Sequence, residues 1–160
     1  MSPPIPNRRQ LLSDPVLLLA FGFGSGCAPK APGTFGTLAA LPLAYLLLLL
    51  PLALYVPVVM IAAIVGVWIC GRASRRLGVH DHSGIVWDEF VGLWVTFIAA
   101  PHGIEWLLLG FVLFRLFDIA KPWPISWLDK HVHGGFGIMI DDILAGLLAA
   151  LCLQLIAYWF

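Results

Sequence analysis

The stretch GIMIDDILAGLLAALCLQLIAYWF, residues 137–160, decides what kind of protein this chain is. From Ile143 onward it is one apolar run, and Asp141 and Asp142 stand together at the start of that run. A helix that crosses a membrane needs roughly 20 predominantly apolar residues. A carboxylate in hydrocarbon is disfavoured by roughly 2.5 to 3.5 kcal/mol on insertion scales. The stretch therefore predicts a membrane helix with two acids that meet a positive partner at one end.

The same pattern occurs twice more along the chain. IVWDEFVGLW (85–94) contains Asp88 and Glu89, and FRLFDIAKPWPI (114–125) contains Asp118. Five acids from three separate apolar segments predict a shared partner, and a divalent cation explains them best.

Composition places the whole chain among integral membrane proteins. Of its 160 residues, 61% are hydrophobic and 11% are charged, with a mean hydropathy of +0.95. We therefore expect one integral membrane domain, residues 1–160, in which residues 1–14 form a flexible tail. The formal net charge is zero, so no global field attracts nucleic acid. The three cysteines form no CxxC pair, which argues against a disulfide framework or a zinc knuckle.

The apolar runs predict an all-α, polytopic helical bundle with about four to five membrane helices and a short N-terminal helix. Arg8 and Arg9 before an apolar run imitate a cleaved signal, but we expect this segment to be retained. Pro51 and Pro57 are expected to bracket the connection between the first two membrane helices. The expected membrane helices cover residues 35–55, 56–70, 85–100, 103–120 and 143–160.

Basic residues gather in the connections on one side of this arrangement. They are Arg8, Arg9, Lys30, Arg72, Arg75, Arg76, Lys121 and Lys130. The positive-inside rule makes that side cytoplasmic, and the five acids lie on the same side. A cation transporter or channel is the alternative function, but it predicts ionisable residues through the depth of the membrane, where this chain has almost none. A non-catalytic lipid-binding protein would not require clustered acids.

Several segments offer groups that could bind phosphate. The loop FGSGCAPKAPGTFGT (23–37) supplies Ser25, Lys30, Thr34 and Thr37 just before a helix, where free amides favour an anion. The alternative is a simple helix entry with Thr34 as the N-cap. The loop is not a Walker A motif, because GxxxxGK[ST] is absent.

Arg115, Asp118 and Lys121 recur every three residues, so the carboxylate lies between two cations on one side of a helix. An ion pair between Arg115 and Asp118 would leave Lys121 free to bind phosphate. The segment HDHSGIVWDE (80–89) adds imidazoles that belong either to a solvated loop or to a catalytic site.

The segment HGGFGIMIDD (133–142) adds His133 before Asp141 and Asp142. Acids at a helix N-terminus are favoured by the helix dipole, by about 0.3 to 1 kcal/mol each. That explanation accounts for one of these acids more easily than for two.

Oxygen ligands without cysteine fit Mg²⁺, which prefers carboxylates, water and substrate phosphate. Together with lysine, arginine and a glycine-rich loop at the membrane surface, they predict phosphoryl chemistry on a lipid headgroup.

Four motifs, in order over residues 21–146, resemble the bacterial phosphatidylglycerophosphatase A family: PGTFGT, VHDHSGIVWDEFVG, FRLFDIAKPWPI and HGGFGIMIDDILAG. The resemblance implies a multi-pass protein of the bacterial inner membrane. It also implies a Mg²⁺-dependent phosphatase that converts phosphatidylglycerophosphate to phosphatidylglycerol and inorganic phosphate. The other partners it implies are membrane lipids, with no obligate protein partner.

The resemblance also implies roles for individual residues. The catalytic acids would be Asp88, Glu89, Asp118 and Asp142, and the metal ligands would be Asp88, Glu89, Asp118, Asp141 and Asp142. The phosphate binders it implies would be Lys30, Arg115 and Lys121, and from their own segments we add Ser25, Thr34, Thr37 and His133 as candidates.

The expected mechanism has one or two Mg²⁺ ions between the carboxylates and the phosphomonoester, an in-line attack by an activated water, and neutralisation of the developing charge by Arg or Lys. The alternative is a covalent aspartyl-phosphate on Asp88 or Asp142. A DxDx[TV] motif is absent, and Cys27 lacks an arginine six positions later.

Overall fold

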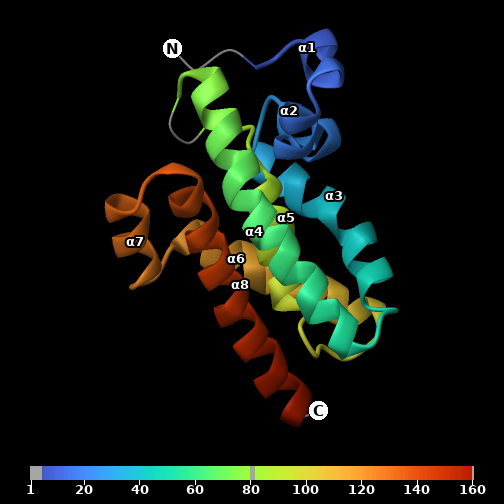
Figure 1. Ribbon diagram of the computed structural model, residues 1–160. Coiled ribbons are helices and arrows are strands. Elements are labelled where there is room, and N and C mark those ends of the chain that lie inside the picture. Colours follow the sequence, from blue (N-terminus) through green and yellow to red (C-terminus); the bar gives the residue numbers. More distant parts are fainter. Residues whose placement is uncertain (1–4, 80–81, 160) are drawn as a thin grey trace.

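The computed structural model describes residues 5–79 and 82–159 of the chain, and regular structure within these residues is entirely helical (Figure 1). This confirms the predicted all-α class. The elements are α1 (Arg8–Ser13), α2 (Pro15–Ala20), the 3₁₀ segment η1 (Gly22–Cys27), α3 (Pro32–Leu47), α4 (Leu52–Leu77), α5 (Trp87–Thr96), α6 (Ile104–Ala120), α7 (Ile125–His131) and α8 (Gly134–Trp159).

The short helix α5 lies at the centre of the bundle, with α3, α4, α6 and α8 packed around it. Figure 1 shows α4 and α8 running in opposite directions along the molecule, with α8 ending at the C-terminal tip. Every residue of α5 except Glu89 is buried. The central helix thus carries two acids, Asp88 and Glu89, in its first turn.

Hydrogen bonds from aromatic side chains tie α5 to its neighbours. The Trp94 indole donates to the Ala40 carbonyl of α3 at 3.3 Å, and the Tyr55 hydroxyl of α4 donates to the Trp94 carbonyl at 2.7 Å. The Trp87 indole donates to the Ala62 carbonyl of α4 at 3.2 Å. These bonds satisfy polar groups in an apolar core, where an unpaired group is costly.

Glycines allow α5 and α8 to approach closely. A Cβ at Gly146 would overlap the Gly92 carbonyl, and a Cβ at Gly92 would lie 2.7 Å from the Asp142 carbonyl oxygen. Small residues permit this kind of backbone contact between membrane helices. The crossing brings Asp142 of α8 beside the first turn of α5.

The predicted helix ends are wrong in several places. Pro57 lies inside α4, so the first connection is residues 48–51 only. Membrane helices tolerate proline in their interior more readily than soluble helices do. The third helix, expected over residues 85–100, is limited to α5. Helix α7 was not expected.

The last helix begins nine residues earlier than the sequence suggested, at Gly134 instead of Ile143. The cause is packing against α4. A Cβ at Gly135 would overlap the Val67 carbonyl and lie 2.8 Å from the Gly71 nitrogen. Gly135 therefore serves a close contact with α4 and does not belong to a loop, and Gly134 begins the helix with φ of +76°.

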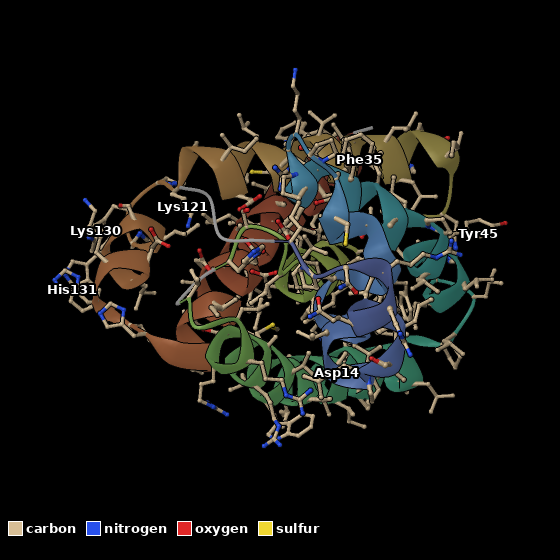
Figure 2. The ribbon with its side chains drawn as sticks, turned by 90° about the horizontal axis from the view of Figure 1, so that it is seen from above. Asp14, Phe35, Tyr45, Lys121, Lys130 and His131 are labelled. Carbon is tan, nitrogen blue, oxygen red and sulfur yellow. The ribbon has the colours of Figure 1, made fainter. Side chains whose placement is uncertain are left out.

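The N-terminal part is helical from Arg8, within the segment expected to be a flexible tail. Asn7 and Gln10 form a capping box on α1, and Asp14 caps α2. The carboxylate of Asp14, which is labelled in Figure 2, also pairs with Arg76 of α4. The N-cap of α3 is Ala31, so Thr34 is not the cap.

Two helices, α4 and α8, are long and apolar enough to cross a membrane. Helix α3 is apolar but shorter than a full span. Four to five membrane helices therefore remain a prediction.

Candidate active site

Three acids from two helices meet at the centre of the bundle. Asp88 and Glu89 come from the first turn of α5, and Asp142 comes from the third turn of α8. One carboxylate oxygen from each lies within 4.8 Å of the other two. Asp88 is 8% exposed and Asp142 is 3% exposed. This carboxylate cluster, Asp88, Glu89 and Asp142, is the core of the candidate site.

The helix dipole explains only part of this arrangement. Asp88 and Glu89 lie in a first helical turn, where negative charge is favoured. Asp141 and Asp142 do not, because α8 already begins at Gly134 and the effect fades after the first turn. The dipole explanation for these two acids is therefore wrong.

Arg115 of α6 connects the cluster to two neighbouring helices. Its guanidinium pairs with Asp118, lies 3.9 Å from the Glu89 carboxylate, and donates to the Thr34 hydroxyl of α3 at 3.2 Å. The Nε atom of Arg115 is buried and has no hydrogen-bond partner in the described part of the chain. The predicted ion pair between Arg115 and Asp118 is confirmed.

Asp118 lies between this arginine and the cluster. Its carboxylate pairs with Arg115, whose guanidinium is 3.9 Å from the Glu89 carboxylate, so Asp118 lies at the edge of the cluster. Four of the five predicted acids thus lie together: Asp88, Glu89, Asp118 and Asp142.

Gly33 is required for this geometry, which the sequence did not reveal. It lies in the first turn of α3, where a Cβ would overlap the Glu89 carboxylate and lie 3.3 Å from Nη1 of Arg115. The glycine leaves room for a carboxylate and a guanidinium against the α3 backbone. The glycine in the motif PGT was visible in the sequence, but a glycine at such a position is more often explained by a flexible loop.

The fifth acid, Asp141, is part of a different contact. Lys121, at the C-terminal end of α6, donates to Asp141 and to Asp129 of α7, both at 2.7 Å. Lys121 is therefore not free, contrary to the expectation. Partial burial would lower the pKa of Lys121, but the hydrogen bonds and charges of Asp129 and Asp141 outweigh burial and raise it.

Asp129 was missed in the sequence, because it lies eight residues after Lys121, and no helical spacing links the two. Figure 2 shows Lys121 on the same side of the bundle as Lys130 and His131 of α7. Asp129 also lines a small cleft of about 130 Å³ that reaches Asp88, His133 and Asp141. The cleft gives the buried cluster a route to the surface beside α7.

The structure places the remaining predicted residues as follows. The Ser25 hydroxyl donates to the Gly22 carbonyl at 2.8 Å, inside η1. The buried Thr37 hydroxyl donates to the Gly33 carbonyl at 2.8 Å. Lys30 is exposed and forms no ion pair with the residues that the structure describes.

His82 is not part of a solvated loop, because it is 2% exposed and its Nδ1 accepts a hydrogen bond from the Gly84 amide. His80 and Asp81 lie outside the described residues.

Comparison with known proteins places the chain in a family. The sequence matches the profile of a family described as phosphatidylglycerophosphatase A over residues 18–157. It is 50% identical over 155 residues to a phosphatidylglycerophosphatase A of Escherichia coli K12, covering 96% of this chain and 90% of that protein. It is 44% identical over 156 residues to the Haemophilus influenzae protein of the same name, covering 96% of each. No solved structure gave a significant match. The chain belongs to the phosphatidylglycerophosphatase A family.

Proposed function

We propose that this protein is a membrane phosphatase that hydrolyses phosphatidylglycerophosphate to phosphatidylglycerol and inorganic phosphate. Family membership supports the reaction class and the substrate. The observation that carries the proposal is the carboxylate cluster with Arg115 at its edge. Buried acids beside a guanidinium provide for both a cation and a phosphate, which a phosphomonoester hydrolase needs.

The carboxylate cluster fits a divalent cation. Three carboxylates within 4.8 Å repel one another unless positive charge lies between them. Oε2 of Glu89 is buried without a hydrogen-bond partner among the described residues, as expected for an oxygen reserved for another ligand. The donors are all oxygens, a set that favours Mg²⁺ over zinc. Asp88, Glu89 and Asp142 would hold Mg²⁺, with Asp118 beside them.

Bound Mg²⁺ would supply Lewis acidity toward a phosphoryl oxygen and lower the pKa of a water. The protein supplies the rest. Arg115 presents a planar fork of donors that suits phosphate, and its contacts with Thr34 and Asp118 hold that fork at the edge of the cluster. A carboxylate of the cluster can take the proton of the attacking water. Because the cluster is buried, each of these charges acts more strongly than it would in bulk water.

Lys121 would attract the substrate phosphate from the other side, where it borders the cleft through Asp129 and Asp141. A lysine is positively charged at neutral pH, and the neighbouring carboxylates raise the pKa of Lys121 further. His133 lines the same cleft and is exposed. The cleft itself is lined by the carboxylates of Asp88, Asp129 and Asp141, so it favours entry of a cation. Lys121 at its border is the nearby group that could attract a phosphate.

We further propose that the protein spans the inner membrane with its site at the cytoplasmic face. Large apolar side chains are exposed around the bundle, including Ile64 at 68% and Leu151 at 58%, which water would disfavour. Exposed aromatic residues lie at both ends, Trp123 and Trp127 near the site and Tyr158 and Trp159 at the C-terminal end. Such belts mark the two membrane interfaces.

The basic residues support the orientation. Arg75 and Arg76 end α4 at the same end of the molecule as α1, while α4 begins at the opposite end (Figure 1). Lys121 caps the C-terminal end of α6, and Lys130 lies in the last turn of α7. The first turns of α5 and the acids of α8 face this basic side, which the positive-inside rule assigns to the cytoplasm.

The decisive experiment is phosphate release by the detergent-purified protein from phosphatidylglycerophosphate, with Mg²⁺ or with EDTA and with phosphatidic acid as competitor. We expect release from phosphatidylglycerophosphate that stops in EDTA and returns with Mg²⁺. Release that continues in chelator would refute the metal mechanism. If folded protein releases no phosphate, the proposed phosphatase activity is refuted. Ion flux in liposomes would then test the transport alternative.

A further inference from the structure

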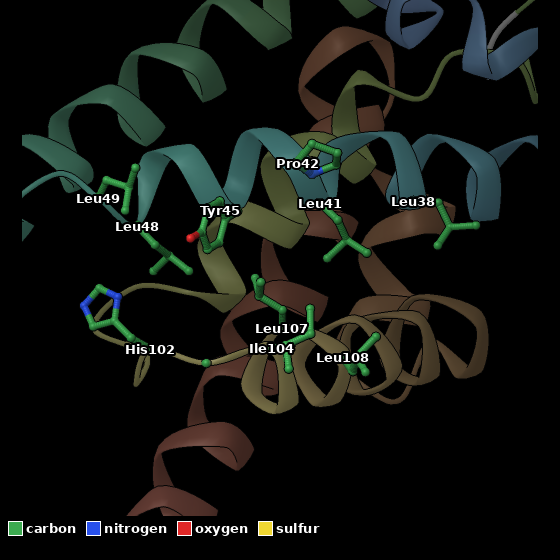
Figure 3. A pocket seen from close by; sticks show the side chains of 11 residues that line it. Leu38, Leu41, Pro42, Tyr45, Leu48, Leu49, His102, Ile104, Leu107 and Leu108 are labelled. Carbon is green, nitrogen blue, oxygen red and sulfur yellow. The ribbon is translucent and has the colours of Figure 1, made fainter.

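An apolar groove lies on the surface of the bundle between α3 and α6 (Figure 3). Its volume is about 780 Å³, within the range of pockets that hold small organic molecules. Figure 3 shows Leu41 of α3 and Leu107 of α6 facing each other across it, with Tyr45 and His102 toward one end. The other side chains that line it are mainly leucines, together with Pro42 and Ile104.

The groove is in line with the candidate active site along both helices. On α3, Leu38 and Leu41 of the lining follow Thr34 at four and seven residues, so all three lie on one face. On α6, Leu108 of the lining precedes Arg115 by seven residues, again on one face. The 3.2 Å contact between Thr34 and Arg115 therefore lies at the head of the same seam between α3 and α6.

The dimensions match a lipid in one leaflet. From Leu38 to Leu48 the helix rise amounts to about 15 Å. That is half of the roughly 30 Å hydrocarbon core of a bilayer. From Leu108 to Arg115 the rise is about 10 Å, which leaves room for the polar part of a lipid between its reacting phosphate and its acyl chains.

We propose that this groove binds an acyl chain of the phospholipid substrate while the headgroup phosphate reaches Arg115 and the carboxylate cluster. The proposal rests on the proposed function, because it assigns the groove to the substrate of that reaction. Binding of the chain along α3 and α6 orients the headgroup toward the site and converts the burial of methylene groups into substrate affinity.

The test compares two substrates of different chain length in the same detergent micelles, dipalmitoyl and dihexanoyl phosphatidylglycerophosphate. Leu108→Trp places a larger side chain in the groove at a position that is 56% exposed, where a larger residue does not disturb the core. Leu151→Trp on α8 is the matched control, because Leu151 is 58% exposed and lies outside the groove.

We expect Leu108→Trp to lower kcat/KM for the long-chain lipid about tenfold, the effect of losing the burial of about two methylene groups, and to change the short-chain value less than about twofold. Leu151→Trp should change neither value. If the two variants have equal kcat/KM on the long-chain lipid, the proposal that the groove binds an acyl chain is refuted, and the proposed phosphatase activity still stands. An equal loss on both lipids would also refute it, because a defect in the site itself would then explain the result.

Crosslinking of the unmodified protein separates the groove from the reaction. A phosphatidylglycerophosphate with a diazirine in one acyl chain should label the segments around Leu41 and Leu107 more than the exposed face of α4. Unlabelled substrate should compete, and phosphatidylcholine with the same chains should not. If phosphatidylcholine suppresses the labelling equally, bulk membrane lipid fills the groove and the proposal is refuted. A crosslink at the groove between two protein molecules would show that a second copy of the protein fills it, which would also refute the proposal. Protein that is labelled in the groove but releases no phosphate would refute the phosphatase and not the groove.

Discussion

Replacing Gly92 by alanine tests whether the close crossing of α5 and α8 positions the acids. The added Cβ would lie 2.7 Å from the Asp142 carbonyl oxygen and 2.6 Å from the Phe114 ring. Ordinary van der Waals contact with a Cβ begins at 3.4 Å, so relief of the backbone contact alone requires a relative shift of 3.4 − 2.7 = 0.7 Å. That shift moves Asp142 away from Asp88 and Glu89.

A misplacement of about 1 Å at reacting groups can cost about a hundredfold in rate. We therefore expect Gly92→Ala to lower kcat/KM for phosphate release by about 30- to 100-fold. Overpacking of the core should also lower the free energy of unfolding by about 1 to 3 kcal/mol. The assays are phosphate release with saturating Mg²⁺ and thermal unfolding in detergent.

Gly78→Ala is the control for the effect of alanine on stability alone. Gly78 caps α4 in the left-handed region, with φ of +67°, and a Cβ there would meet nothing within 4 Å. The substitution strains the backbone by about 1 to 2 kcal/mol without touching the site. We expect it to lower stability by a similar amount and to keep the rate. A full rate for Gly92→Ala, or an equal loss of rate in both variants, would refute the positional argument.

Other substitutions probe single groups of the site. Asp88→Asn or Asp142→Asn should abolish phosphate release while membrane insertion persists, and a near-normal rate for either variant would remove that residue from the core of the site. Arg115→Lys should lower kcat/KM by about tenfold or more, because an ammonium cannot reach Thr34, Asp118 and a phosphate together. Lys121→Met should lower the free energy of unfolding by about 1 to 3 kcal/mol, because Asp141 loses a charged hydrogen bond in a partly buried position; unchanged thermal unfolding would show that this contact is not stabilising.

The Lys121 contact also has a defined pH dependence. The pKa of Lys121 is raised in the folded protein, so its contribution to stability is fully present below the pKa of an unfolded lysine. It is lost only as the pH rises through the higher folded value. Between pH 6 and 9, the unmodified protein should therefore be more stable than Lys121→Met by a constant amount, measured by thermal unfolding. A difference in stability that disappears near neutral pH would contradict the ion pair.

The sequence was sufficient for the fold class because apolar runs separated by proline, glycine and basic residues leave few alternatives to helices. It was not sufficient for the helix ends. Gly134 and Gly135 have the composition of a loop, yet they belong to α8, because α4 leaves no space for a side chain at Gly135. Contacts of this kind depend on a partner helix more than sixty residues away, and no local pattern reports them.

The acids show the same limit. Adjacent residues on a helix diverge by about 100°, so the pair in α8 had to face two directions. The rotation of α8 about its axis decides which of the two acids points toward α5. That rotation is set by the contact of Gly146 with Gly92. Asp142 consequently joins the carboxylate cluster, and Asp141 contacts Lys121.

Two partly buried cations, Arg115 and Lys121, pair with some of the acids and leave the others without a positive partner, which predicts that bound metal stabilises the protein. Arg115 pairs with Asp118, and Lys121 pairs with Asp129 and Asp141. Negative charge therefore remains in excess around Asp88, Glu89 and Asp142, which lie within 4.8 Å of one another. A cation that binds the folded state alone stabilises it by about 2.7 kcal/mol at a hundred times its Kd.

We accordingly expect Mg²⁺ to raise the thermal unfolding temperature of the unmodified protein and EDTA to lower it. In Asp142→Asn the repulsion is smaller and a ligand is weakened, so the apoprotein should be more stable than the unmodified apoprotein and should gain less from Mg²⁺. This readout does not require turnover, so it separates the metal site from the reaction. Equal shifts with Mg²⁺ in both proteins would place the cation elsewhere.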